Sequence, residues 1–434
     1  MRFVSTLALG ALIFAMQTFS QTPAQLAEIW DKEHVTNKLP SNLRHQDLKL
    51  YLDGLLKLGL KVNEVGRSNA NREIYQIEWG KGPLKIFLWS QMHGDEPTAT
   101  SALIDMFTVL EKNRDQEWAK RIAEKVTIRA VPMLNPDGAE VFIRRNLQGI
   151  DINRDALDLK TPEGRLLKQL RDSWQPEIGF NLHNQQALTA AGQTDKQAAI
   201  SFLVVYGDEA KTPSDGHERN KRIVAAMIQA LNQFIPGHIA RYDDEWTPTA
   251  FGDNFSKWGT PVILIETGGL HGKDEMYLVK MNFVAMMTAL KVVADGTEKD
   301  FSPSNYEYLP SNSGRRLMNI VFRGGTVIDV ATAAGAAADI GINLERRRAA
   351  FVAPAMVRAV GSISMRGLDE YDASNFHIVG RIQPIKPGNF AELLFYKRDR
   401  QIDWKVPDIE KEFPPDAILS LGKWIKGAGV VPKR

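Results

Sequence analysis

The sequence contains no cysteine among its 434 residues. This absence excludes disulfide bonds, a thiolate nucleophile, a thiolate metal site and the lipid-anchored class of exported proteins. Any transition metal must therefore be held by histidine and carboxylate side chains. The chain also lacks an excess of charge of one sign, since its formal net charge is only +2. A charge so near balance, without a basic stripe or tail, gives no electrostatic reason to expect nucleic acid or an anionic membrane surface as a partner.

Long apolar runs are absent beyond the first twenty residues, where Arg2 precedes an uncharged stretch from Phe3 to about Phe19. Small residues just before Gln21 favour cleavage after Ser20, so we expect residues 1–20 to be a signal peptide. An uncleaved anchor is the alternative, because the run is at the lower limit for crossing a bilayer. We therefore expect a secreted or periplasmic protein without an integral membrane segment after signal removal.

The sequence as a whole has the composition of an ordinary globular protein, with 44% hydrophobic and 24% charged residues. Apolar runs alternate with amphipathic stretches, which predicts an α/β domain over residues 21–300 whose mixed, mostly parallel sheet is flanked by helices. The expected strands are Leu84 to Trp89, Val126 to Val131, Ile178 to Leu182, Phe202 to Tyr206 and Val262 to Ile265. The expected helices are Thr98 to Lys112, Glu163 to Trp174, Glu218 to Phe234 and Glu275 to Val293.

Polar residues follow three of these strands, at the edge of an α/β sheet where ligands gather. His93 and Glu96 lie three apart after the first strand, His183 ends the third, and Glu266 ends the last. A strand-to-helix turn with His-x-x-Glu spacing can aim an imidazole and a carboxylate at one point, as a His₂Glu zinc site requires. Each residue also has an ordinary interpretation: a solvated surface pair, a hydrogen-bonded structural histidine, or a glutamate that caps a turn.

A second polar segment, residues 144–155, is rich in hydrogen-bond donors. It contains Arg144, and further along it Asn153 stands next to Arg154. The planar guanidinium of arginine matches a carboxylate, and the amide of asparagine adds donors, so this pair could hold the terminal carboxylate of a substrate. The alternative is a solvated basic loop with local ion pairs.

The motifs recur in a recognisable order over roughly Leu43 to Gly296. They are Gly66-Arg67-Ser68 with a strand from Ile74 to Trp79, His93-x-x-Glu96, Asn135-Pro136-Asp137-Gly138, the run from Arg144 to Arg154, His183 and Glu266. Together they resemble the zinc carboxypeptidase family, the carboxypeptidase A-like metallopeptidases. The resemblance implies one zinc ion, held by His93, Glu96 and His183, with water at the fourth position. Asp151 or Asp155 would then orient the imidazoles.

The resemblance also implies the catalytic roles. Glu266 would take a proton from the attacking water and pass it to the leaving amine. Arg144 would stabilise the oxyanion that develops on the scissile carbonyl. Asn153 and Arg154 would bind the carboxylate of the released residue, so the reaction would be that of an exopeptidase.

Three further positions bear on the substrate. Tyr242 is the candidate for the family's substrate-contacting tyrosine, although the surrounding residues do not fix its register. Asp253 lies where residues of the specificity pocket are expected, and there it could favour a basic or amino-bearing side chain or be a plain turn aspartate. Asp95 stands where digestive members usually have arginine, and this form is similar to bacterial members that cleave peptidoglycan peptides.

Beyond about Asp300 the sequence changes character, and a linker rich in turn residues precedes short apolar runs. We expect residues 301–434 to form a β-rich accessory module that packs on the enzyme or binds a partner. Its expected strands are Leu317 to Phe322, Thr326 to Val330, Ala338 to Leu344, Ser362 to Met365, His377 to Ile382 and Glu392 to Tyr396.

The sequence thus predicts a zinc metallocarboxypeptidase that acts on peptides or peptidoglycan-derived peptides. One alternative is a zinc deacylase of small N-acyl amino acids, of the aspartoacylase or succinylglutamate desuccinylase type, which resembles the family around His-Gly-x-Glu. Export, length and the full run from Arg144 to Arg154 disfavour it. Another is a non-catalytic binding protein on the same fold, against which the intact Glu266 and the complete ligand set argue. The oligomeric state is left open.

Overall fold

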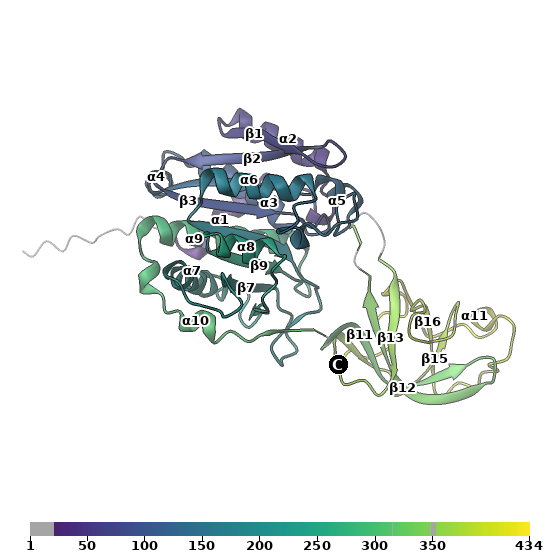
Figure 1. The fold of residues 1–434 in the computed structure, drawn as a ribbon. Helices are drawn as coiled ribbons and strands as arrows, with labels where there is room; N and C mark the ends of the chain where they lie inside the picture. Colours follow the sequence, from purple (N-terminus) through teal and green to yellow (C-terminus); the bar gives the residue numbers. More distant parts are fainter. Residues whose placement is uncertain (1–20, 315, 346, 349–352) are drawn as a thin grey trace, which may run out of the picture.

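The structure, a computed structural model, describes residues 21–314, 316–345, 347–348 and 353–434. The predicted signal peptide, residues 1–20, lies outside the described residues. Figure 1 shows a larger part in which a sheet is sandwiched between helices, and a smaller part made mostly of strands near the C-terminus. This arrangement confirms the predicted α/β class followed by a β-rich region.

The larger part is built on an eight-stranded sheet in the order β1-β2-β4-β3-β5-β9-β7-β8. Its strands are β1 (Lys61–Arg67), β2 (Glu73–Gly80), β3 (Leu84–Ser90), β4 (Val126–Val131), β5 (Ile178–Asn184), β7 (Ile200–Val205), β8 (Ile239–Arg241) and β9 (Val262–Thr267). The central run β4-β3-β5-β9 is parallel, whereas β2 and β7 pair antiparallel with its two ends. The predicted mixed, mostly parallel sheet is therefore confirmed.

Helices cover both faces of this sheet because its central strands are apolar on both sides. Along β3, Ile86 and Leu88 belong to one buried cluster, and Phe87 and Trp89 belong to another. The first cluster packs under α1 (Pro23–Glu33), α2 (His45–Lys57), α3 (Thr98–Lys112), α4 (Glu117–Lys125), α7 (Asp215–Leu231) and α9 (Glu275–Asp295). The second packs under α6 (Pro162–Trp174) and α8 (Phe251–Lys257). This two-sided burial is typical of parallel sheets.

Short elements make up the rest of the larger part. They are η1 (Pro40–Asn42), α5 (Pro136–Val141), η2 (Ile152–Arg154), η3 (Glu298–Asp300) and α10 (Ser304–Glu307). Among the described helices, α9 is the one long and apolar enough to cross a membrane, but 72% of its most apolar window is buried inside the protein. The core helix of a globular protein passes the same test.

The smaller part holds a second eight-stranded sheet, which we call the β module. Its strands are β11 (Leu317–Asp329), β12 (Ala334–Leu344), β13 (Ala355–Gly361), β14 (Arg366–Asp372), β15 (Phe376–Gly380), β16 (Leu393–Lys397), β17 (Ala417–Ser420) and β18 (Lys423–Lys426), with a short helix α11 (Ile409–Glu412). The two strands expected between Leu317 and Val330 form one strand, interrupted by an irregularity between Phe322 and Gly325.

The strand expected at Ser362 to Met365 is wrong, since this segment is the bend between β13 and β14. The guanidinium of Arg323 fills the bend, where it donates to the carbonyl oxygens of Ile363 (2.6 Å) and Met365 (2.7 Å). These carbonyls are therefore turned toward a side chain and not toward a neighbouring strand. Ile363, one of the apolar residues that suggested a strand, is buried in this bend.

Candidate metal centre and substrate cleft

The four polar residues predicted at strand ends meet at one edge of the sheet. β3, β5 and β9 are adjacent and parallel, so their carboxyl ends lie side by side. His93 and Glu96 follow β3, while His183 on β5 stands directly opposite Glu266 on β9 in the sheet register. All four side chains are buried.

The turn after β3 is shaped by close packing against α5. A Cβ at Gly94 would lie 2.0 Å from the carbonyl carbon of Gly138, so any larger residue would push the turn away from this helix. The side chain of Gln91 donates to the carbonyl of Gly94, and the amide of Glu96 donates to the carbonyl of His93. These contacts fix the three-residue spacing that brings His93 and Glu96 to one point.

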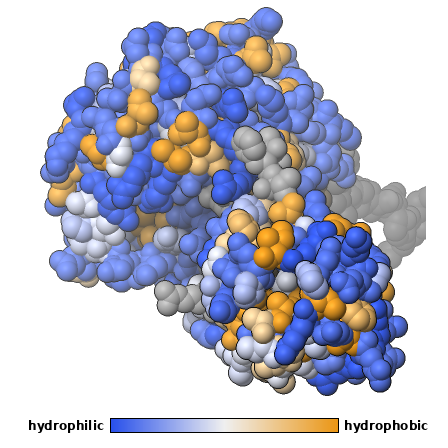
Figure 2. Space-filling model, turned by 90° about the vertical axis from the view of Figure 1, so that its right-hand side faces the viewer, coloured by the Kyte–Doolittle hydropathy of each residue, from blue (hydrophilic) through white to orange (hydrophobic). Residues whose placement is uncertain are grey.

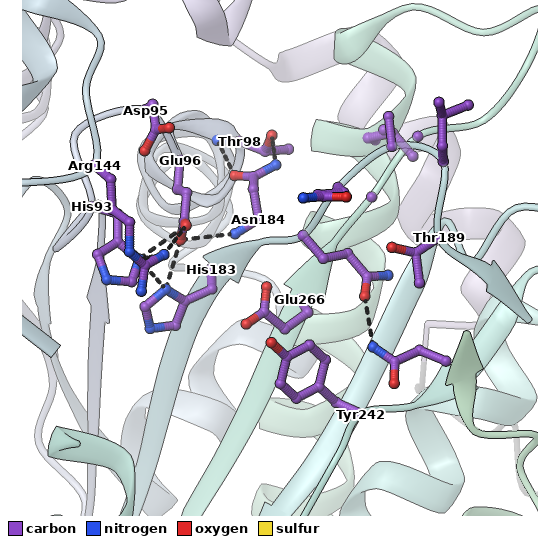
Figure 3. A pocket seen from close by; sticks show the side chains of 18 of the residues that line it. His93, Asp95, Glu96, Thr98, Arg144, His183, Asn184, Thr189, Tyr242 and Glu266 are labelled. Atoms are coloured by element: carbon purple, nitrogen blue, oxygen red, sulfur yellow. Dashed lines mark hydrogen bonds and ion pairs between the residues drawn. The ribbon is translucent and has the colours of Figure 1, made fainter. Parts of the chain in front are cut away.

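The candidate ligand atoms of His93, Glu96 and His183 converge as a zinc site requires, and Figure 3 shows these side chains facing one another. Nδ1 of His183 lies 2.6 Å from one carboxylate oxygen of Glu96, and Nδ1 of His93 lies 2.9 Å from the other. The two Nδ1 atoms are 3.1 Å apart. Tetrahedral zinc with Zn–N distances of about 2.0–2.1 Å would hold two nitrogens roughly 3.3 Å apart, so the group fits this metal.

Asp151 contacts the ring nitrogen of His93 that does not face the other candidate ligands. Its Oδ1 atom lies 3.0 Å from Nε2 of His93, and its Oδ2 atom accepts a hydrogen bond from Nε of Arg144 at 2.9 Å. A proton kept on Nε2 by this carboxylate leaves the Nδ1 lone pair free for a metal. Of the two aspartates proposed to orient a histidine, Asp151 therefore has the required contact. Asp155 instead accepts hydrogen bonds from the backbone of Lys160 and from Thr161.

The buried cluster favours positive charge at its centre. Burial alone lowers the pKa of His93, but the charge of Glu96 and the hydrogen bond to Asp151 together raise this pKa to about 9. Burial raises the pKa of Glu96, whereas the neighbouring imidazoles lower it, and the net direction is well below its ordinary value. Burial lowers the pKa of His183. A cation between these groups would satisfy the carboxylate without requiring protonation of both rings.

Arg144 lies beside the candidate metal ligands and reaches the cleft. One of its Nη atoms lies 3.2 Å from Nδ1 of His93 and donates to Glu96 at 3.3 Å. Its side chain remains 43% exposed. The ion pair with Asp151 restrains the guanidinium, so a fixed positive charge faces the solvent side of the ligand group.

Glu266 and Tyr242 face each other across the same cavity. Burial and the nearby charge of Glu96 raise the pKa of Glu266 well above its ordinary value. Figure 3 shows the hydroxyl of Tyr242 directed toward the Glu266 carboxylate. Burial and the charge of Glu266 raise the pKa of Tyr242, so its hydroxyl keeps its proton and can donate. Tyr242 is placed by its backbone amide, which donates to the carbonyl of Phe202 beyond the end of β8.

The remaining predicted residues line the same cleft, which encloses about 1140 Å³. Oδ1 of Asn153 accepts from the backbone amide of Phe251 at 2.9 Å, which ties η2 to α8. Arg154 is exposed beside it. Asp253 on α8 accepts from the amide of Thr247 at 3.0 Å, and burial raises the pKa of Asp253 to about 6 against the opposing charge of Arg154.

The structure thus brings together all nine residues selected from the sequence. Asn184 was not predicted from the sequence. Its backbone amide donates to Glu96 at 3.2 Å, and its side chain donates to Thr98. Its place directly after His183 was the available signal. The residues of the β module that line the cleft were not predicted either, because nothing in their sequence indicates which distant segment they approach.

Comparison with known proteins found a family model that matches part of this chain. Residues 59–236 match the family model of zinc carboxypeptidases. This segment contains His93, Glu96, Arg144 and His183, whereas Glu266 lies beyond it.

Individual relatives are similar over shorter stretches. Carboxypeptidase 2 of Trichophyton rubrum is 33% identical over 109 residues, which is 25% of this chain and 20% of that protein. The human carboxypeptidase N catalytic chain is 28% identical over 123 residues, 23% of this chain and 27% of that one. A metallo-carboxypeptidase structure from Burkholderia cenocepacia aligns with a TM-score of 0.48 at 17% identity, over 58% of this chain and 69% of the other. The chain spans about a fifth of the length of the first curated relatives. Residues 59–236 of this chain are therefore similar to the zinc carboxypeptidase family.

Proposed function

We propose that this protein is a zinc metallocarboxypeptidase, which hydrolyses the C-terminal amide bond of a peptide or a peptidoglycan-derived peptide. One observation carries the proposal: the ligand atoms of His93, Glu96 and His183 converge in the same cleft that Glu266 lines. Three ligands that leave a coordination position open are typical of catalytic zinc and not of structural zinc.

A zinc ion on these ligands would supply a Lewis acid that polarises the scissile carbonyl and acidifies a water molecule. Glu266 takes the proton of the attacking water and delivers it to the leaving amine. The hydroxyl of Tyr242 donates a hydrogen bond toward the reacting groups, since its raised pKa keeps it protonated. Arg144 presents its guanidinium to the carbonyl oxygen, where a fixed donor stabilises developing negative charge.

Asn153 and Arg154 bind the terminal carboxylate in this proposal. The backbone of Phe251 holds the Asn153 side-chain oxygen, so the amide NH₂ is the part of Asn153 that remains available as a donor. Arg154 adds a charged guanidinium group beside this amide. Two of its N–H groups can bond both oxygens of a carboxylate, which makes a carboxylate a better partner than an uncharged carbonyl. Recognition of a free carboxylate at this end of the cleft makes the enzyme an exopeptidase.

We further propose that the chain is secreted or periplasmic, with residues 1–20 as the signal peptide. The charged Arg2 followed by the uncharged run from Phe3 supports this location. We divide the rest into a catalytic domain at residues 21–300 and an accessory module at residues 301–434, because the two large sheets fall on opposite sides of this boundary.

The first test is mass-spectrometric product analysis of the zinc-loaded protein with linear peptides, peptidoglycan stem peptides and N-acyl amino acids. We expect release of a single C-terminal residue from free peptides and no release when the terminal carboxylate is amidated. The amidated peptides are matched controls, because they keep the side chain and remove only the group that Asn153 and Arg154 would bind. Cleavage of N-acyl amino acids alone would replace this proposal with the deacylase function.

A second expectation concerns the released residue and pH. If Asp253 binds a basic terminal side chain, the preference should depend on its ionisation, and its pKa is raised to about 6. The carboxylate is charged above this pKa and mostly neutral below it. The ratio of kcat/KM for a peptide ending in lysine to that for one ending in norleucine should therefore fall by about tenfold from about pH 7.5 to about pH 5. Asp253→Asn should give the low ratio at both pH values; a ratio unchanged by this variant would remove Asp253 from specificity.

A further inference from the structure

The β module forms one wall of the substrate cleft. Figure 2 shows the smaller lobe lying against the larger one, with a hollow between them. Residues of the module that line the cleft with the zinc-ligand group include Asn319, Asn343, Glu345 and Arg358. A wall contributed by a second sheet allows the module to contact whatever the catalytic domain binds.

Arg348 anchors this wall on one side of the cleft. It lies in the connection between β12 and β13, and its guanidinium donates to the carbonyl oxygens of Ala139 and Glu140, both at 2.5 Å. These carbonyls belong to the last turn of α5, where the carbonyl of Ala139 also accepts from the backbone amide of Phe142 at 3.4 Å. The side chain of Arg348 is only 6% exposed. The anchor is therefore a buried contact with the helix that precedes Arg144.

Contacts with the β5–β7 and β9–α9 connections anchor the other side. Strand β10 (Asn312–Ser313) pairs with β6 (Ala190–Ala191). Arg316 bonds both the side chain and the backbone of Gln193. His271 lies 3.4 Å from Asp369 of β14. Because the module is attached on both sides, its cleft-lining face holds a defined position relative to the zinc ligands.

Two asparagines on this wall present free amide donors. Oδ1 of Asn319 on β11 accepts from the backbone amide of Leu344 at 2.8 Å, and Oδ1 of Asn343 on β12 accepts from the backbone amide of Asn319 at 3.3 Å. Each side-chain oxygen is thus engaged by the strand pair, which fixes the orientation of the amide. Within the described residues, neither NH₂ group has an acceptor, although both side chains are half-buried in the cleft wall.

We propose that Asn319 and Asn343 form a subsite that binds the main chain of the substrate on the N-terminal side of the scissile bond. The inference rests on the proposed carboxypeptidase activity. When Asn153 and Arg154 hold the terminal residue, the rest of the peptide must leave the cleft past its other walls. Two adjacent NH₂ donors match the carbonyl oxygens of an extended peptide and are indifferent to its side chains. The module therefore selects unfolded peptides several residues long over dipeptides.

Asn319→Asp and Asn343→Asp test the subsite. Aspartate keeps the side-chain oxygen that accepts a hydrogen bond from the neighbouring strand, and it replaces the NH₂ donor with a second oxygen. Asn375→Asp is the matched control, since Asn375 is an exposed module residue outside the cleft lining and acquires the same charge. The substrates are an N-acylated dipeptide and a pentapeptide with the same last two residues. We expect the pentapeptide-to-dipeptide ratio of kcat/KM to fall by about tenfold in the double variant and to stay unchanged in the control.

Binding provides a readout that does not depend on turnover. In a zinc-loaded Glu266→Gln background, calorimetry should show the Kd of the pentapeptide rising by a similar factor when both asparagines are replaced. If the wild-type protein releases terminal residues but the double variant changes neither the kcat/KM ratio nor the Kd of the pentapeptide, the subsite is wrong and the carboxypeptidase activity stands. If neither peptide is bound or cleaved by the wild-type protein, the activity is wrong, and the subsite is overturned with it.

Discussion

Glu266→Gln is expected to lower kcat by roughly 10²- to 10⁴-fold, the usual contribution of a positioned general base and acid. Glutamine has nearly the same shape as glutamate but cannot accept the proton of the attacking water. Zinc should remain stoichiometric, because the cluster of ligand atoms consists of His93, Glu96 and His183 without Glu266. The measurement is steady-state kinetics on a free peptide together with metal analysis of the same sample.

The control for this substitution is Glu245→Gln. Glu245 also lines the cleft, but its side chain is exposed, so its replacement removes the same charge without altering the buried site. We expect near-normal kcat in this variant. Activity of Glu266→Gln close to that of the wild type would remove Glu266 from the mechanism, even if the zinc ligands were confirmed.

His183→Ala is expected to abolish tight zinc binding. Its Nδ1 atom lies within 3.1 Å of both other ligand groups, so alanine removes one of three protein ligands and leaves the Glu96 carboxylate without its shortest contact. Removing a residue that only hydrogen-bonds a metal ligand typically lowers metal affinity by about 10- to 100-fold. Removing a ligand itself should lower the affinity for zinc by more than this. Zinc content after dialysis against a chelator measures the effect, and turnover should fall with it.

His271→Ala is the matched control for zinc binding, because His271 is an exposed histidine close to the cleft and outside the ligand cluster. Circular dichroism of both variants separates loss of metal from loss of fold. Stoichiometric zinc in a folded His183→Ala protein would show that the ligand set is wrong.

The sequence predicted the central strands of the larger part closely, since apolar periodicity is a local property. The strand Val126–Val131 and the helix Thr98–Lys112 have the predicted bounds, and the ends of β3, β5 and β9 differ by a few residues. Prediction was poorer in the β module, where several strands, such as β17 and β18, are only four residues long. There the segment from Ser362 was taken for a strand, because the role of the distant Arg323 in binding its carbonyls cannot be read from local pattern.

The sequence by itself determined which residues are candidates for the chemistry. The absence of cysteine limited a metal to histidine and carboxylate ligands, and the polar residues at strand ends supplied the candidate ligands, because parallel strands bring their carboxyl ends to one edge. Only the tertiary structure decided which partners these residues have. The choice of Asp151 to hold His93, the direction of Tyr242 toward Glu266 and the approach of Asn319 and Asn343 to the cleft all join segments far apart in the chain. Such contacts depend on how the packed layers are arranged in space. A local stretch of sequence does not determine the distance between residues that lie in different layers.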